Sequence, residues 1–189
     1  MIYHNLMDEK LLQYIKNSMI NGRVCRFSKN IIKFYISKIS SPMPDHEKYN
    51  YYKIVENAAF VYNPLGIFNY QKTETPTDAD IVVNWVKTGR VFEGMCKYRS
   101  IVASEIKAIT IEIGLPNPHS PKIITDNTIR HSAIHEFGHA AGLGHGTDEN
   151  DIMFVPHTKT LANLSQNDIE VLKILYKNPI GTPFANIVY

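Results

Sequence analysis

The order of apolar and polar residues predicts a helix among several strands in the first two thirds of the chain. Strand-like runs, rich in β-branched and aromatic residues, cover 31–36, 67–70, 81–86, 106–113 and, more weakly, 91–98. Between the first two runs, apolar residues recur at helical spacing over residues 47–62, and Pro64 and Gly66 end this predicted helix. The expected order is one strand, one helix and then four strands.

Three further segments have helical features. An amphipathic helix near the N-terminus is predicted by apolar residues at Leu11, Leu12, Ile15 and Met19. A second helix is predicted at residues 126–142, where Thr125 or Asp126 can serve as the N-cap. A third is predicted at residues 165–177, where Ser165 can cap the first turn.

The composition is that of one globular domain. The chain has 189 residues, of which 44% are hydrophobic and 20% are charged, so wholesale disorder is not expected. No apolar run reaches the ~18 residues that span a bilayer, and the formal charge of only +2 gives no reason to expect a nucleic-acid partner. Cys25 and Cys96 can form one disulfide or stay free, but neither lies in a CxxC pair, which excludes a thiolate zinc site.

The strongest chemical signal is an HExxHxxGxxH motif at residues 135–145. His135 and His139 are four residues apart, so on a helix their imidazoles share one face and can reach one metal ion. Glu136 is rotated from His135 by roughly 100° around the helix, which puts its carboxylate beside the metal rather than on it. From that position it can take a proton from a metal-bound water.

Gly142 explains how His145 can join the same ion. In a continued helix His145 would lie roughly 9 Å beyond His139 along the axis, whereas a glycine with positive φ ends the helix and turns the chain back. Three neutral imidazoles would leave a fourth position for water, which is the arrangement of a catalytic zinc site. A set that included both His131 and His139 would span about 12 Å of helix, so we expect no ligand at His131.

With these residues the chain resembles the metzincins, zinc endopeptidases with this motif and a methionine turn beneath the metal. Met153 follows His145 by eight residues, and residues 164–169 with Tyr176 resemble a C-terminal helix, both as in the matrixin branch (peptidase family M10). The resemblance implies an α+β fold: a mixed, twisted five-stranded sheet, two long helices and a small C-terminal subdomain with a third helix. The implied segments are an N-terminal extension, a catalytic domain and a tail, at residues 1–29, 30–178 and 179–189.

The resemblance also implies a function. A metalloendopeptidase would hold one catalytic Zn²⁺ at His135, His139 and His145, with Glu136 as the general base. Its protein or peptide substrate would extend along an edge strand, for which residues 91–98 are the candidate, and we expect a monomer. The pocket for the residue after the cleaved bond would be walled by Phe154, Val155, Pro156 and His157.

The sequence departs from the matrixin pattern in several ways. Neither cysteine has the Pro-Arg-Cys-Gly context of a cysteine switch, and residues 87–105 contain no histidine for the second, structural zinc of animal matrixins. A Ca²⁺ ion is possible but unsupported, because the acidic loop residues lack EF-hand spacing. We expect these residues to be solvated charges: Asp78, Asp80, Asp126, Asp148 and Asp151.

Two other functions and the compartment stay open. A catalytically inactive zinc-binding module would need a closed, four-ligand site, and a zinc hydrolase of a small amide would need a walled-off cleft. Relatives of this type usually work outside the cell. Charged residues at 8–10 nevertheless interrupt the apolar stretch that an export signal would need, so an intracellular location also stays open.

Overall fold

Five strands form one mixed sheet. The computed structural model describes residues 9–87, 93–116 and 124–189. The strands are β1 (Ile31–Ile36), β2 (Asn69–Lys72), β3 (Ile81–Val86), β4 (Gly94–Val102) and β5 (Glu105–Gly114). Their spatial order is β2-β1-β3-β5-β4, and all neighbours are parallel except β4, which runs antiparallel to β5 at the edge. The predicted mixed five-stranded sheet is confirmed.

Side chains alternate across the sheet, and one face becomes the core. In β1, Ile32, Phe34 and Ile36 are buried, while Ile31 and Lys33 are exposed. Because successive side chains of a strand point to opposite faces, this alternation gives the sheet one apolar face that helices must cover.

Two strands differ from their predicted bounds. β2 begins two residues later than predicted, because Ile67 and Phe68 belong to the preceding turn, where Phe68 is buried. β4 extends past residue 98 to a hairpin with β5, whose turn residues Ala103 and Ser104 have φ angles of 50° and 66°. Polar and apolar residues do not alternate regularly there, so the pattern gave no sign of this extension; residues 91 and 92 lie outside the described residues.

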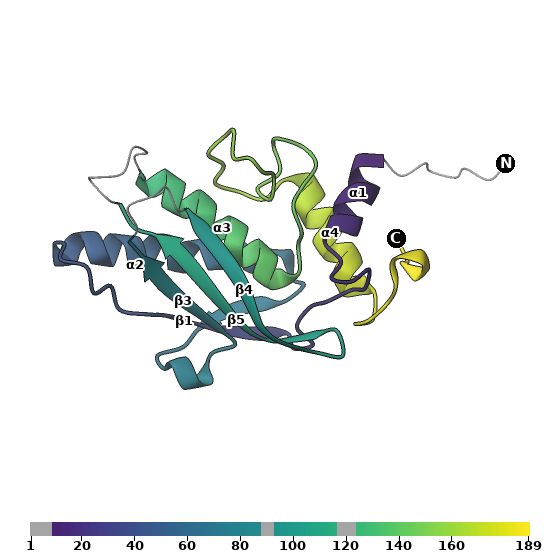
Figure 1. Cartoon of the computed structure of the whole chain (residues 1–189), viewed down its shortest axis with the longest axis horizontal. Helices are drawn as coiled ribbons and strands as arrows, with labels where there is room; N and C mark the ends of the chain where they lie inside the picture. Colours follow the sequence, from purple (N-terminus) through teal and green to yellow (C-terminus); the bar gives the residue numbers. More distant parts are fainter. Residues whose placement is uncertain (1–8, 88–92, 117–123) are drawn as a thin grey trace.

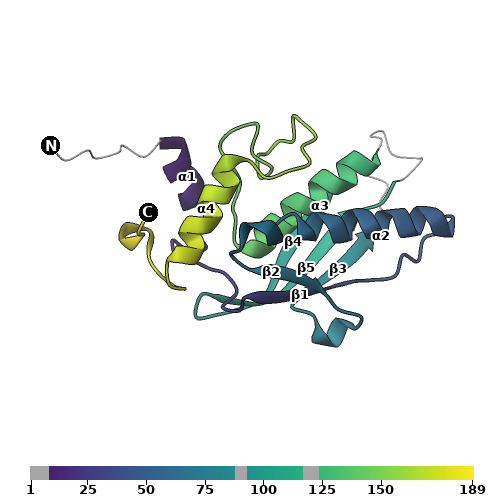
Figure 2. The same cartoon turned by 180° about the vertical axis from the view of Figure 1, so that it is seen from behind.

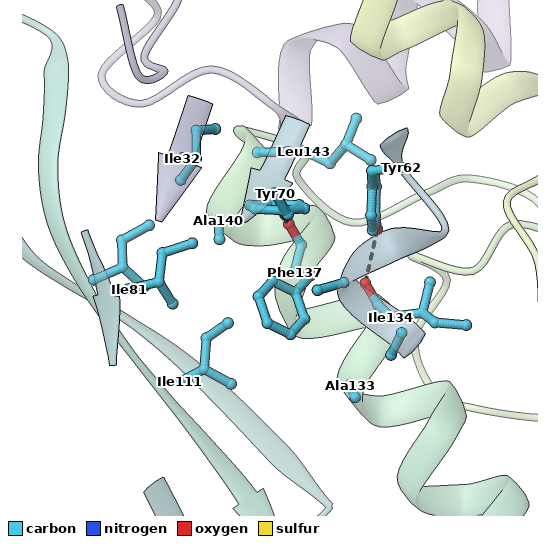
Figure 3. Close-up of a cluster of buried hydrophobic side chains, with 14 of the residues drawn as sticks. Ile32, Tyr62, Tyr70, Ile81, Ile111, Ala133, Ile134, Phe137, Ala140 and Leu143 are labelled. Carbon is cyan, nitrogen blue, oxygen red and sulfur yellow. Dashed lines mark hydrogen bonds between the residues drawn. The ribbon is translucent and has the colours of Figure 1, made fainter. Parts of the chain in front are cut away.

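Two long helices cover the apolar face of the sheet (Figures 1 and 2). These are α2 (Asp45–Phe60) and α3 (Asp126–Ala141). Phe137 and Ala140 of α3 point toward Ile81 and Ile111 of the sheet (Figure 3). Tyr62 also donates a hydrogen bond of 2.7 Å to the carbonyl of Ile134, tying the segment after α2 to α3.

Helices α1 (Glu9–Asn17) and α4 (Gln166–Lys177) lie side by side at one end of the molecule (Figures 1 and 2). The predicted N-cap of α4 is present, since the Ser165 hydroxyl accepts from the Asp168 backbone and the Asp168 carboxylate accepts from the Ser165 backbone. Short 3₁₀ helices occupy Asn63–Leu65, Pro76–Asp78 and Phe184–Asn186.

The structure bears on the state of the two cysteines and on the presence of membrane-spanning helices. Cys25 and Cys96 are both free thiols, so the chain has no internal disulfide. Within the described ranges, no helix combines the length and the hydrophobicity needed to cross a bilayer.

Candidate metal centre

Helix α3 carries the first part of the motif and ends where the sequence predicts. Thr125 is the N-cap, and its hydroxyl accepts from the backbone of Thr128 at 3.2 Å. Gly142 follows the last turn with a φ of 104°, and the Leu143 amide then donates back to the Gly138 carbonyl at 2.9 Å. Because a left-handed residue reverses the chain at a helix end, the three residues after Gly142 can return toward the helix.

Three imidazoles converge at this turn. His135, His139 and His145 each offer a nitrogen, and these nitrogens lie within 4.8 Å of one another. His135 donates through Nδ1 to the Ile152 carbonyl at 2.9 Å, and His139 donates through Nδ1 to the Leu143 carbonyl at 2.8 Å, because a carbonyl oxygen can only accept. The ring proton of both residues is therefore on Nδ1, which leaves the Nε2 lone pairs available to a metal ion.

Burial keeps two of these rings neutral. Burial, followed by the positive charge of its neighbour His139, lowers the pKa of His135 to about 2. Burial also lowers the pKa of His139 to about 4. Only a neutral imidazole can bind a metal, so both rings are in the ligand form at pH 7.

Glu136 lies beside the three histidines, and the residue is only 5% exposed. Burial raises its pKa to about 8, while the backbone of Cys96 on β4 acts in the opposite direction. The carboxylate belongs to a cavity of about 250 Å³ between α3, β4 and the loop after Met153. The residues that line this cavity are Gly94, Met95, Cys96, His135, Glu136, His139, His145, Val155 and His157.

The comparison with protein families bears directly on this arrangement. A family model described as matrixin matches residues 26–177, a span that contains the sheet and the histidine cluster. The chain belongs to the matrixin family. The match confirms the predicted α+β fold of this family and supports a zinc metallopeptidase domain. A search of the curated proteins finds no match to this matrixin.

A second histidine group in this matrixin is less suited to a metal. Nitrogens of His131, His135 and His157 also lie within 4.8 Å of one another. His131 accepts through Nδ1 from the backbone amide of Leu161 at 2.9 Å, and a backbone amide can only donate. The neutral ring of His131 therefore carries its proton on Nε2, where a ligand needs a lone pair. The residues fit zinc at His135, His139 and His145, whose donor set also has a carboxylate beside it.

His157 is the neighbour that sequence reasoning did not connect with the histidines. Its Nδ1 lies 2.8 Å from a carboxylate oxygen of Glu93, and its buried Nε2 has no hydrogen-bond partner among the residues that the structure describes. Its ring centroid is 4.9 Å from that of His135. Glu93 and His157 are 64 residues apart in the chain, so no spacing in the sequence could have revealed the pair.

Met153 packs against helix α3 at Gly138. It is fully buried, and its sulfur fills the space where a side chain at position 138 would be. Gly138 lies between His135 and His139 on α3, so the methionine supports the helix directly under the two histidines. The role of Met153 as a structural floor remains a prediction.

The carboxylate of Asp151 holds the turn before Met153, although it was expected to be solvated. Asp151 is only 1% exposed, so the expectation of a solvated loop charge is wrong at this position. Its oxygens accept from the backbone of Thr147 and Asp148 and from the side chains of Ser165 and Asn167. A buried carboxylate is tolerated when such donors surround it, but an acidic residue in a loop carries no sequence signal of these contacts.

Of the four predicted wall residues, Val155 and His157 line the cavity at the histidines. Phe154 is half-buried and Pro156 is exposed. His157 also lines a neighbouring cavity of about 170 Å³, together with Glu93, His131 and the polar residues Thr128, Thr158, Lys159 and Thr160. The side of the cleft near His157 is thus lined mainly by polar side chains.

Proposed function

We propose that this matrixin is a zinc-dependent endopeptidase, with a catalytic domain at residues 30–178. In this proposal His135, His139 and His145 are the zinc ligands and Glu136 is the general base. The observation that carries it is the convergence of three imidazole nitrogens within 4.8 Å, beside a buried carboxylate in one cavity. A structural zinc site would be closed by a fourth protein ligand, and Glu136 is the one carboxylate that lines this cavity among the described residues.

Each residue has a distinct part in the chemistry. Zinc bound by the three histidines would act as a Lewis acid toward the scissile carbonyl and its attacking water. Glu136 takes a proton from that water and then gives a proton to the leaving amine. The carbonyls of Ile152 and Leu143 keep His135 and His139 in the tautomer that binds.

The edge strand β4 supports a peptide substrate rather than a small amide. Among the described strands β4 pairs with β5 alone, so its other side has main-chain groups available to an added strand. Gly94, Met95 and Cys96 of this strand line the same cavity as Glu136. An extended peptide that hydrogen-bonds to β4 would therefore pass beside the carboxylate, whereas a small amide gains nothing from such an edge.

The test compares zinc content and casein cleavage in the wild type and in Glu136→Ala. We expect one zinc ion per chain in both proteins, because Glu136 is not a ligand. Cleavage should fall by a factor on the order of 10²–10⁴ in the variant, as expected when a general base is lost. Glu74→Ala is the matched control, since the Glu74 side chain is 89% exposed.

The outcomes separate the proposal from its alternatives. Equal cleavage by wild type and Glu136→Ala would refute the role of Glu136. Zinc binding by a wild type that cleaves neither casein nor peptides would favour an inactive zinc-binding module or a hydrolase of small amides.

A further inference from the structure

The N-terminal helix α1 contacts the loop that carries the third histidine. The family model begins at residue 26, so α1 and the residues that follow it lie before the matched region. Tyr14 and Ile15 fix the helix on the body of the protein, since both are fully buried. The C-terminal end of α1 then reaches the segment between α3 and Met153 (Figure 1).

Two hydrogen bonds join this helix end to the backbone next to the metal centre. The Asn17 side-chain amide donates to the carbonyl of His145 at 3.0 Å. The Gly144 amide donates to the Ser18 hydroxyl at 2.9 Å, and that hydroxyl donates to the Tyr14 carbonyl at 2.9 Å. Asn17 is itself oriented by Gln13, whose amide donates to it at 2.7 Å.

The two segments also touch backbone to backbone. A Cβ atom built on Gly144 would overlap the carbonyl group of Asn17 and the amide of Ser18. Glycine at this position therefore lets the loop lie directly against the end of α1, which is the close approach that only a residue without a side chain permits.

His145 depends on this backbone contact more than the other two histidines do. Nδ1 of His135 and of His139 is fixed by a carbonyl, whereas no hydrogen bond to a described residue holds the imidazole of His145. His145 is also exposed. Its ring is thus brought to the other histidines mainly through its backbone, which Asn17 and Ser18 hold together with the hydrogen bond from the Gly146 amide to the Met153 carbonyl at 2.9 Å.

We propose that Asn17 and Ser18 are positioning residues of the metal centre, which act through Gly144 and His145. The inference rests on the proposed function, because it takes His145 as a zinc ligand. It extends the metal centre to a segment outside the matched family region. Residues that orient a metal ligand contribute to affinity because they hold it in place before the ion arrives.

The test measures zinc affinity of the full chain by competition with a chromophoric chelator, and the visible absorption of the Co²⁺ form. Asn17→Ala and Ser18→Ala should each weaken zinc binding about tenfold, which is the lower end of the effect of losing a residue that orients a metal ligand. Both substitutions should also alter the absorption bands of the Co²⁺ form. Asn50→Ala is the matched control, because the Asn50 side-chain amide likewise joins two separate segments, donating to Asp126 at 2.8 Å. The control should leave affinity and bands unchanged.

A double-mutant cycle separates positioning from general stability. In a His145→Ala background, Asn17→Ala should weaken zinc binding no further, because the group it positions is already gone. Equal weakening in both backgrounds, or wild-type affinity in both single variants, would overturn the inference while leaving the proposed function intact. A wild type that binds no zinc would overturn both.

Discussion

We expect Glu136 to lower the free energy of unfolding of the metal-free protein. The residue is 5% exposed, and burial raises the pKa of its carboxyl group to about 8, so the folded state disfavours the ionised carboxylate. Glu136→Gln keeps the size and an accepting oxygen but removes the charge. The variant should therefore unfold less readily than the wild type while it loses peptidase activity.

The pKa sets the size of the gain and its dependence on pH. The unfolded carboxyl has a pKa near 4.5 and the folded one a pKa of about 8, so between these values the folded state binds a proton that the unfolded state does not. The contribution of this carboxyl group to the free energy of unfolding of the wild type therefore decreases as the pH rises from about 4.5 to about 8. At pH 7 the difference amounts to about 3 kcal/mol in favour of the variant.

Urea denaturation of the chelator-treated proteins at several pH values measures the effect. Subtracting the wild type from the variant cancels the protonation of the histidines, which both proteins share. Glu74→Gln, at a side chain that is 89% exposed, should change the free energy of unfolding by less than about 0.5 kcal/mol.

Two results would contradict this reasoning. One is an advantage of Glu136→Gln that does not grow between about pH 5 and pH 8. The other is an advantage that persists after zinc is added, because a cation beside the carboxylate favours its ionised form and should offset the cost of burial.

Other variants test the ligand assignment, the helix end and the turn. His139→Ala should weaken zinc binding strongly in chelator competition and His131→Ala should not, because the proton of His131 is on Nε2; equal losses would contradict that tautomer. Gly142→Ala should cost about 1 kcal/mol or more in urea denaturation, since φ is 104° there, and an unchanged midpoint would argue against the turn. Asp168→Ala should cost about 2–4 kcal/mol by the same measurement, because it leaves two backbone amides and a tyrosine hydroxyl without their acceptor. A loss below about 0.5 kcal/mol would show that water replaces the carboxylate.

Much of the fold could be predicted from the sequence because the signals that mark helices, strands and helix ends lie in residues close together in the chain. The period of apolar residues located α2 and the strands β1, β3 and β5, and Ser165 and Gly142 marked helix ends whose geometry depends on a few neighbouring residues. The convergence of His139 and His145 follows from the same kind of signal, since only a left-handed residue between them is required.

The supports of the site could not be predicted because they join distant parts of the chain. The Asp168 carboxylate accepts from the amide of Ile152, whose carbonyl accepts from His135, and Tyr14 donates to Asp168 from 154 residues away. From its sequence neighbours Tyr14 resembles an ordinary surface-helix residue, and Asp168 is recognisable only as the capping-box partner of Ser165. Their role becomes visible only when the sheet, the turn and both small helices have been brought together.

This division between motif and support has a consequence for the chemistry. The motif supplies the nitrogens and the carboxylate, but their orientation comes from Ile152, Leu143 and the end of α1. Orientation decides whether a histidine offers a lone pair or a proton, as the contrast between His131 and His135 demonstrates on a single helix face. A chain with an intact motif but altered supports should therefore lose metal affinity before it loses its fold, because the ligands are held by a few specific hydrogen bonds and the core is not.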